Sequence, residues 1–349
     1  MVTLKDIAEI CNVSVSTVSR ALAGSQLIGA AKQEFIRDTA RRLHYVPNIS
    51  ARTLAGGKSG TIGLLIMSVE SNYYASIVQS IGRELRELAY GFMVAIGDYD
   101  YRNELEALRS FDGRNMDGMI LVGPFSEQLN DNLPKLLDLF SRPSVIVQAF
   151  ARCDFATHIT MDDKAGIASI LEYLLDMGHK KIGFITERQS HSRRLETFLS
   201  LLPRYGVEHN PAFIKIGNSR FEAGGYEAMN AMLEQEERPT VILFNSDNIA
   251  IGGLKSVLEH GLKVPEDLSL VGYDGVKEAA YLPSPLTTVA QPVNEMARLA
   301  VAGLIQRLER GYKGEHINLS VTPRLVIRST TAPPKNGNAR AVEERSVSR

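Results

Sequence analysis

Residues 14–20 combine several hydroxyl side chains with one guanidinium group in a short run near the amino terminus. Serine and threonine hydroxyls bind phosphate oxygens well, and they can also meet the edges of bases. Arginine can donate a bidentate pair of hydrogen bonds to guanine, and Arg20 ends this run. The run therefore predicts recognition of double-stranded DNA rather than the making or breaking of a covalent bond.

Two short helices are expected to present this run. Thr3 and Asp6 have the spacing of a capping box, which begins a helix that ends near Cys11. Ser14 then suits the cap of a second helix, which runs from Val15 to about Leu22. The side chains expected on the outer side of this second helix are Val15, Ser16, Ser19 and Arg20.

A miniature apolar core is expected beneath these helices, completed by a third helix from about Ala31 to Leu43. The side chains predicted to form it are Leu4, Ile7, Ala8, Val18, Leu22, Phe35, Ile36, Ala40 and Leu43. Two short helices joined by a tight turn, with a polar outer face on the second, indicate a helix-turn-helix. A plain three-helix bundle with a serine-rich turn is the alternative.

Each predicted DNA contact follows from the chemistry of its side chain. Arg20 is expected to pair with guanine, Val15 to touch a thymine methyl group, and Ser16 to hydrogen-bond to either kind of base. The remaining predicted contacts in this segment are Ser14, Thr17 and Ser19, which suit phosphate oxygens, and Thr3 on the first helix.

Length and composition bound the rest of the chain. With 349 residues, of which 44% are hydrophobic and 23% charged, it is long enough for two or three globular domains. The formal net charge is -1, yet through residue 58 basic residues outnumber acidic residues by eight to four. A basic head on an acidic body is what a DNA-binding appendage produces.

Several classes of protein are not expected. Cys11 and Cys153 are too few and too far apart for a metal site or a disulfide framework, and no cofactor is predicted. The amino terminus lacks the apolar core of a signal peptide, and no run approaches the roughly 18 apolar residues of a membrane span. No catalytic triad or phosphate-binding loop is evident. We therefore expect a cytoplasmic protein that is neither an enzyme nor a membrane protein.

Residues 48–58 are expected to form a hinge between the head, residues 1–47, and a larger body. Asn48 suits a helix cap and Gly56 a helix stop, which allows about two turns of helix. So short a helix is marginal in water, and we expect it to fold only against a partner. An ordinary linker, with Leu54 tucked against the core, is the alternative.

The body, residues 59–332, alternates apolar strands with amphipathic helices. Strands are expected at Thr61–Ile66, Phe92–Ile96, Met119–Val122, Val145–Val147, Ile182–Ile185, Val241–Phe244 and Leu268–Gly272. Helices are expected near Ser76–Leu88, Glu104–Arg114, Asn130–Phe140, Lys164–Met177, Arg193–Tyr205, Gly225–Glu234 and Ile249–His260. This order predicts an α/β fold with parallel sheets, in two lobes that face each other across a ligand cleft. Residues 333–349 are predicted to be a disordered polar tail.

Several motifs resemble the lactose/purine repressor family, from about Val2 to Thr331. The motifs in the head and hinge are VTLKDIA at residues 2–8, VSVSTVSRAL at 13–22, LHYVPN at 43–48 and ARTL at 51–54. The motifs in the body are DMGHKKIGFI at residues 176–185, VPEDLSLVGYD at 264–274 and PLTTVAQP at 285–292. The resemblance implies a helix-turn-helix head and a two-lobed body similar to periplasmic binding proteins.

The same resemblance implies how the head binds DNA. It places base contacts at the positions of Val15, Ser16 and Arg20. It also implies a hinge helix that pairs with its dimer mate in the minor groove, where the residue matching Leu54 wedges between base pairs. The hinge contacts are then Asn48, Ala51 and Leu54. Lys32 stands where the family usually has threonine, and we expect it to make a phosphate contact through its charge. A homodimer on a pseudo-palindromic operator is implied.

The resemblance further implies a small-molecule effector in the body. The contacts carried over by position are Tyr73, Tyr74, Phe125, Gln148, Arg194, Phe221, Asp247 and Asp274. Carboxylates and arginine bind paired hydroxyls, and aromatic faces stack on sugar rings, so a carbohydrate is expected. Each of these residues has an alternative role. Asp247 or Asp274 would cap the next helix, Arg194 would lie on the surface, and Tyr73 and Tyr74 would belong to the core.

Some positions depart from the family pattern. Gln148 and Ala149 stand where many relatives carry Asp and Arg, while Ser246 and Asp163 each replace a common Asn. The expected function is a transcriptional regulator, most simply a repressor of a metabolic operon, controlled by a sugar or sugar derivative. A nucleobase, a nucleoside or a phosphoprotein as the controlling molecule is an alternative. A solute-binding protein of a transporter is the alternative from another class.

Overall fold

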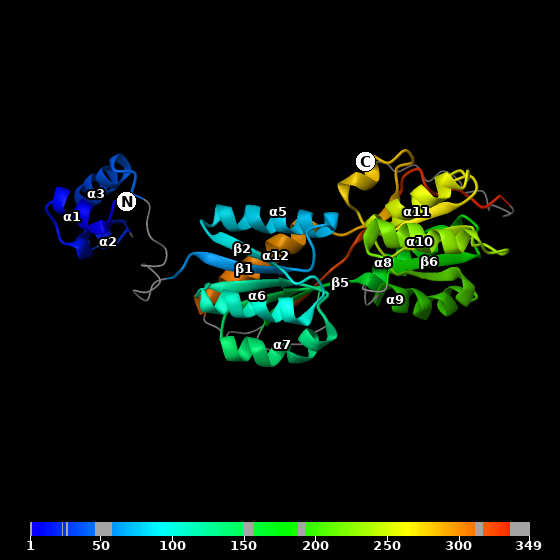
Figure 1. Ribbon diagram of the computed structural model, residues 1–349, viewed down its shortest axis with the longest axis horizontal. Coiled ribbons are helices and arrows are strands. Elements are labelled where there is room, and N and C mark those ends of the chain that lie inside the picture. The colour runs from blue at the N-terminus through cyan, green and yellow to red at the C-terminus, as the bar shows by residue number, and fades with distance from the viewer. Residues whose placement is uncertain are drawn as a thin grey trace. The chain divides into compact units, whose positions relative to one another are not determined.

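The computed structural model describes residues 2–22, 24–25, 27–45, 58–148, 156–187, 193–310 and 317–335. The chain divides into two compact units, residues 1–59 and 60–349 (Figure 1). The predicted hinge contacts Asn48, Ala51 and Leu54 lie outside the described residues, as does the chain beyond residue 335.

In the described part of the first unit, the chain forms three helices, α1 (Leu4–Ile10), α2 (Val15–Leu22) and α3 (Ala30–Arg42). The predicted capping box is present: the Asp6 amide donates to the Thr3 hydroxyl, and the Thr3 amide donates to the Asp6 carboxylate. The predicted second cap is present too, because the Thr17 amide donates to the Ser14 hydroxyl at 3.2 Å. The buried core is Ile7, Ala8, Val18, Ala21, Ile36 and Ala40.

One predicted core residue of this unit is wrong. Phe35 is 51% exposed, whereas Thr39 is buried and its hydroxyl donates to the Phe35 carbonyl at 2.9 Å. The inner stripe of α3 is centred on Ile36 and Ala40, one helical turn apart. Phe35 lies at the margin of that stripe, because successive residues of a helix point about 100° apart.

The second unit begins with a lobe built on a six-stranded parallel sheet, which we call lobe 1. The strands in spatial order are β11 (Asn318–Val321), β5 (Ala156–Met161), β4 (Ser144–Val147), β3 (Gly118–Val122), β1 (Thr61–Ile66) and β2 (Gly91–Ile96). Helices α5 (Asn72–Glu87) and α12 (Val293–Arg310) pack together on one face of the sheet, and α6 (Tyr101–Gly113) and α7 (Glu127–Phe140) cover the other (Figure 1).

Lobe 2 repeats this plan around a second six-stranded sheet. Its strands in spatial order are β12 (Arg324–Val326), β10 (Thr287–Ala290), β9 (Ser269–Asp274), β8 (Val241–Phe244), β6 (Ile182–Glu187) and β7 (Ile214–Gly217). All these strands run parallel except for the antiparallel pair β10 and β12. The helices are α8 (Asp163–Asp176), α9 (Arg193–Leu201), α10 (Phe221–Leu233) and α11 (Asp247–Glu259), with short 3-10 helices at Leu202–Tyr205, Pro211–Phe213 and Lys277–Ala280.

The chain passes between the lobes where β5 leads to α8, where β10 leads to α12, and where β11 leads to β12. The sequence prediction missed β5, β7, β10, β11, β12 and α12. Four of these strands are only three or four residues long, and β5 contains the polar residues Thr157, His158 and Thr160. Within the described residues, no helix is long and apolar enough to cross a membrane.

Helices α10 and α11 pack so closely that glycines form their contact. A Cβ atom on Gly225 would lie 1.9 Å from the Ile249 carbonyl oxygen, and one on Gly252 would lie 1.8 Å from the Glu222 carbonyl oxygen. Both obstacles are backbone atoms, so no side-chain movement can relieve them. The start of α10, which carries Phe221, is therefore fixed against α11.

We predict that Gly252→Ala lowers the free energy of unfolding by about 1–3 kcal/mol, because the added methyl group must push the two helices apart. Chemical unfolding followed by circular dichroism measures this. Gly113→Ala is the matched control, since nothing lies within 4 Å of its Cβ position. The control should be neutral or should stabilise by up to about 1 kcal/mol, because alanine favours helix. Equal behaviour of the two variants would contradict the backbone contact.

Candidate functional site

The outer face of α2 presents the predicted DNA-reading side chains to solvent. Val15 is 44% exposed, and Ser16, Ser19 and Arg20 are exposed as well. The Ser14 hydroxyl lies 2.8 Å from the hydroxyl oxygens of both Ser16 and Thr17. The first turn of α2 thus carries a cluster of hydroxyls that donate and accept hydrogen bonds, with an apolar side chain beside them. This combination suits a groove that displays bases and phosphates together.

The other two predicted contacts of the head lie at helix starts. The Thr3 amide and the Thr3 hydroxyl both donate to the Asp6 carboxylate, the hydroxyl at 2.9 Å. These two hydrogen bonds lower the pKa of Asp6. Lys32 is exposed in the first turn of α3, where Gly29 caps the helix without a side-chain hydrogen bond. A cation there extends the positive end of the helix, which favours a phosphate.

A pocket in the second unit is formed where strands of both lobes end. It is lined by Ser71, Tyr73, Tyr74, Tyr99, Gly123, Pro124, Gln148, Thr160, Met161, Asp163, Glu187, Arg193, Arg194, Phe221, Asn245, Ser246, Asp274 and Gln291. Most of these residues lie at or just after the carboxyl end of a strand, or in the first turn of the following helix. This is the edge at which open α/β sheets bind ligands.

Arg194 is the polar centre of this pocket. Its Nη1 donates to the Asn245 carbonyl at 2.6 Å and to Asp274 Oδ1 at 3.1 Å, and its Nε donates to Asp163 Oδ1 at 3.2 Å. The guanidinium also lies 3.9 Å from the centre of the Tyr273 ring. The side chain is only 16% exposed, so the surface alternative for Arg194 does not hold.

A chain of hydrogen bonds connects lobe 1 to this centre. The Tyr73 hydroxyl donates to Gln148 Oε1 at 2.5 Å, and Gln148 Nε2 donates to Gln291 Oε1. Gln291 Nε2 then donates to Asp274 Oδ1 at 2.6 Å. Burial raises the pKa of Tyr73, so its hydroxyl keeps the proton that it donates. Gln291 lies where β10 leads to α12, so this chain of hydrogen bonds passes from lobe 1 to lobe 2 at a connection between the lobes.

Aromatic side chains from both lobes form another wall. Tyr74 donates to the Gly123 carbonyl at 3.0 Å, and the Phe221 amide donates to the Glu187 carboxylate. Tyr99 and Phe221 have φ angles of 56° and 51°, in the left-handed region. Such backbone strain persists only where the surroundings hold it, and it is concentrated at functional sites.

An ion pair next to this wall joins the lobes. Arg220 Nη1 donates to Asp98 Oδ1 at 2.5 Å. The Arg220 guanidinium also lies 5.0 Å from the Tyr99 ring centre and 5.1 Å from that of Phe221. Asp98 and Arg220 directly precede two pocket-lining residues in the sequence, so the aromatic wall and the contact between the lobes depend on each other.

Comparisons with known proteins agree with this arrangement. Residues 3–48 match the profile of bacterial regulatory proteins of the lacI family, and residues 171–331 match that of the periplasmic binding protein-like domain. The HTH-type transcriptional repressor CytR of Escherichia coli K12 is 31% identical over 342 residues, which cover 95% of this chain and 97% of CytR. The chain belongs to the lacI family.

Two further relatives support that assignment. The ribose operon repressor of Haemophilus influenzae is 30% identical over 334 residues, which cover 95% of this chain and 98% of that repressor. The crystal structure of the lac repressor dimer bound to operator and the anti-inducer ONPF superposes with a TM-score of 0.84 at 25% identity, covering 95% and 99% of the two chains. The two-lobed α/β fold with a helical DNA-binding head, predicted from the sequence, is confirmed.

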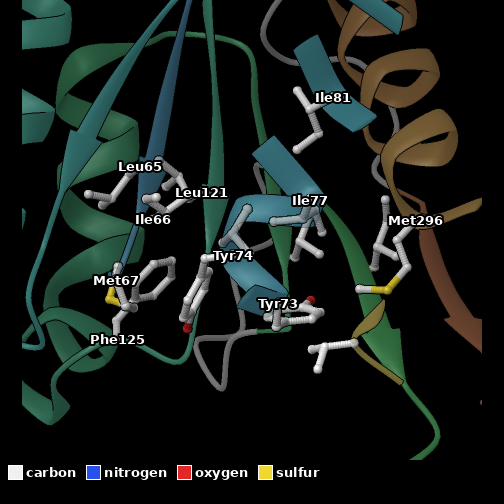
Figure 2. Close-up of a cluster of buried hydrophobic side chains, with 14 of the residues drawn as sticks. Leu65, Ile66, Met67, Tyr73, Tyr74, Ile77, Ile81, Leu121, Phe125 and Met296 are labelled. Carbon is white, nitrogen blue, oxygen red and sulfur yellow. The ribbon is translucent and has the colours of Figure 1, made fainter. Parts of the chain in front are cut away.

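In this lacI-family regulator, six of the eight predicted effector contacts line the pocket. They are Tyr73, Tyr74, Gln148, Arg194, Phe221 and Asp274. Phe125 does not reach it: the side chain is 1% exposed and belongs to the buried cluster that contains Met67 and Tyr74 (Figure 2). Tyr73 and Tyr74 belong both to that core cluster and to the pocket lining. The alternative that they are core residues is therefore correct, but they also line the pocket.

Asp247 is the second predicted contact that the structure does not bring to the pocket surface. It is fully buried, where Oδ1 accepts from the Thr288 hydroxyl at 2.6 Å and Oδ2 accepts from the Val276 amide at 2.8 Å. Nor does it cap α11, because Ser246 does so by accepting from the Ile249 amide. Asp247 instead ties the loop after β9 to β10, and so positions the end of β9, where Asp274 lies.

The sequence prediction missed several lining residues, among them Tyr99, Asp163, Glu187, Asn245 and Gln291. Asn245 and Tyr99 follow predicted strands within a few residues, so the rule that ligands bind beyond strand ends could have found them. Gln291 follows β10, which was not predicted, so nothing in the sequence placed it at the sheet edge. Asp163 follows β5, which was not predicted either, and the sequence pointed to it only as a position where the family commonly carries Asn.

We predict a pH dependence of stability that Asp247 controls. Burial, reinforced by the charge of Asp274, raises the pKa of Asp247 from 3.8 to about 8. Between these values the folded protein holds a proton that the unfolded chain releases, so the free energy of unfolding falls as pH rises. Asp247→Asn removes this loss, because an amide can serve both the Val276 amide and the Thr288 hydroxyl.

Urea unfolding from pH 4.5 to pH 8 measures the effect. The stability of the wild-type protein relative to Asp247→Asn should fall by more than about 1 kcal/mol across this range. Asp131→Asn, on the exposed side of α7, is the control and should show no such trend. A difference between wild type and Asp247→Asn that stays constant with pH would rule out the buried, protonated carboxyl.

Proposed function

We propose that this lacI-family chain is a repressor that binds a pseudo-palindromic operator as a homodimer and responds to a small polyhydroxylated effector in the pocket between its lobes. The observation that carries the proposal is the buried Arg194, held between Asp163 and Asp274 at the edge of the lobe 2 sheet. Carboxylates and a guanidinium beside aromatic rings recognise the paired hydroxyls and the apolar face of a sugar.

The relatives support both halves of this proposal. Relatives that match this chain over nearly its full length are repressors, and one of them is named for a ribose operon. The structure with the TM-score of 0.84 is a dimer on its operator. Dimerisation also follows from recognition itself, because one helix such as α2 reads too few base pairs, and a two-fold operator matches a two-fold protein.

Control by the effector requires that it bind two conformations of the body with different affinity. The placement of the pocket supports such control, since its walls belong to separate lobes: Tyr73 and Gln148 to lobe 1, Arg194 and Asp274 to lobe 2. Any change in the angle between the lobes changes the distance between these walls. A ligand that bridges them therefore favours one angle, and we propose that this angle governs pairing of the two hinges in the dimer.

The same proposal covers location and chemistry. Because a repressor acts on DNA inside the cell, we propose that this protein works in the cytoplasm. Its pocket binds a molecule without transforming it, so we assign it no catalytic step and no cofactor.

We predict that Arg20→Ala weakens binding to the preferred operator by about 1–3 kcal/mol and relaxes base preference at one position. Selection from a random duplex library with the wild-type protein defines that operator, and gel-shift titration measures affinity. Arg41→Ala is the control of equal charge, since Arg41 is exposed on α3 and paired with Glu34 and Asp38. If both variants lose the same affinity and keep the same preferred sequence, α2 does not read bases.

We predict that Arg194→Lys reduces the response to the effector at least about tenfold, because a lysine cannot donate to both carboxylates in the fixed fork of a guanidinium. A thermal-shift panel of sugars and nucleosides identifies the effector, and operator affinity is then titrated against it. Arg204→Lys, exposed beyond α9, should respond like the wild type. A normal response of Arg194→Lys would place the effector elsewhere.

A further inference from the structure

The hydrogen-bond chain from Tyr73 to Asp274 has a single direction, and Asp274 fixes it. A carboxylate can only accept, and Asp274 Oδ1 receives both Arg194 Nη1 and Gln291 Nε2. Gln291 must therefore turn its carbonyl oxygen toward Gln148. Gln148 must in turn donate its amide nitrogen, so its own carbonyl oxygen accepts the proton of Tyr73. The Tyr73 hydroxyl and one N–H of each glutamine amide are therefore used inside the protein.

Several of the atoms left for a ligand on this side are acceptors that carry no hydrogen of their own. The Tyr73 hydroxyl uses its O–H in the hydrogen bond to Gln148, and the lone pairs on its oxygen remain free to accept. Asp163 Oδ1 already accepts from Arg194 Nε and from the Tyr273 hydroxyl at 3.0 Å. Among the described residues, neither Asp163 Oδ2 nor Asp274 Oδ2 accepts a hydrogen bond. A molecule in the pocket therefore meets several oxygens that need protons, and it satisfies them only by donating.

The charges at the pocket also disfavour an anionic ligand. Its lining carries three acidic side chains, Asp163, Glu187 and Asp274, and two basic ones, Arg193 and Arg194. The buried one of the two cations, Arg194, is already held by two carboxylates and a carbonyl oxygen. A phosphate group would bring negative charge and further acceptors to this wall, where the repulsion is little screened.

We propose that the effector is a neutral molecule with adjacent hydroxyl groups, that is, an unphosphorylated sugar or a glycoside such as a nucleoside, and that the pocket rejects the phosphate esters of the same compounds. This inference rests on the proposed function, because it concerns the same pocket. Hydroxyls satisfy both requirements of the wall, since each can donate to a carboxylate oxygen and accept from the unused Nη2 of Arg194.

The direction of the chain can be tested without any ligand, with Gln148→Glu in the full-length protein. The introduced carboxylate cannot donate, so one of its oxygens faces the Gln291 carbonyl and the chain breaks. At pH 7.5 we expect a melting temperature about 3–10 °C below that of the wild type. The deficit should shrink below about pH 5, where the introduced group gains a proton and can donate.

Gln128→Glu makes the same change on the exposed surface of α7 and is the matched control. It should melt like the wild type at both pH values. If Gln148→Glu also melts like the wild type at pH 7.5, or if its loss of melting temperature does not depend on pH, the hydrogen-bond chain has no fixed direction and the inference fails.

Binding is tested by calorimetric titration of the wild-type chain at pH 7.5 with matched pairs. The pairs are ribose and ribose 5-phosphate, glucose and glucose 6-phosphate, and cytidine and cytidine 5′-monophosphate, with inorganic phosphate as a further probe. We expect at least one neutral member to bind and its ester to bind at least tenfold more weakly. An ester that binds equally well or better, or the failure of every neutral member to bind, overturns the proposal.

Operator affinity, measured with each compound, separates this inference from the proposed function. If an ester binds and changes operator affinity, the chain is an effector-controlled repressor and only the exclusion of phosphate is wrong. If a neutral compound binds with the expected preference but leaves operator affinity unchanged, the ligand class is right and the control by the pocket is wrong.

Discussion

The guanidinium of Arg194 lies between two carboxylates, and several elements of lobe 2 hold the partners of this guanidinium in place. A buried cation is costly unless its partners are held in good geometry and its donors are satisfied. Here the partners come from three separate elements: Asp163 begins α8, Asn245 follows β8, and Asp274 ends β9. The planar fork of arginine fits this set in a way that a lysine ammonium would not.

Buried residues next to the pocket hold these partners and the pocket walls in place. Asp247 receives the Val276 amide and the Thr288 hydroxyl, which fixes the chain just after Asp274. Gly252 and Gly225 let α11 and α10 touch through their backbones, which fixes the start of α10 and hence Phe221. The pocket is therefore preorganised on lobe 2, while Tyr73 and Gln148 close it from lobe 1. Under the proposed function, a ligand between them responds to the relative position of the lobes.

Local patterns predicted the head and most of the repeated strands and helices well, because caps and apolar periodicity are properties of short segments. The errors share a cause. Helices α5 and α10 begin four residues earlier than predicted, at Asn72 and Phe221. Their first turns carry Tyr73, Tyr74 and Phe221, which line the pocket, and the apolar period from which each helix was predicted starts only after them.

The sequence by itself determined the two kinds of domain, the exposed polar face of α2, and the polar and aromatic residue types that line the pocket. It could not decide which of those residues meet. Phe125 and Asp247 have the right chemistry but lie in the core, whereas Asp163 and Gln291, more than a hundred residues apart, join one hydrogen-bonded wall. Convergence of that kind depends on the order of strands in two sheets and on where the chain crosses between them. Those are long-range properties, and no local pattern of residues encodes them.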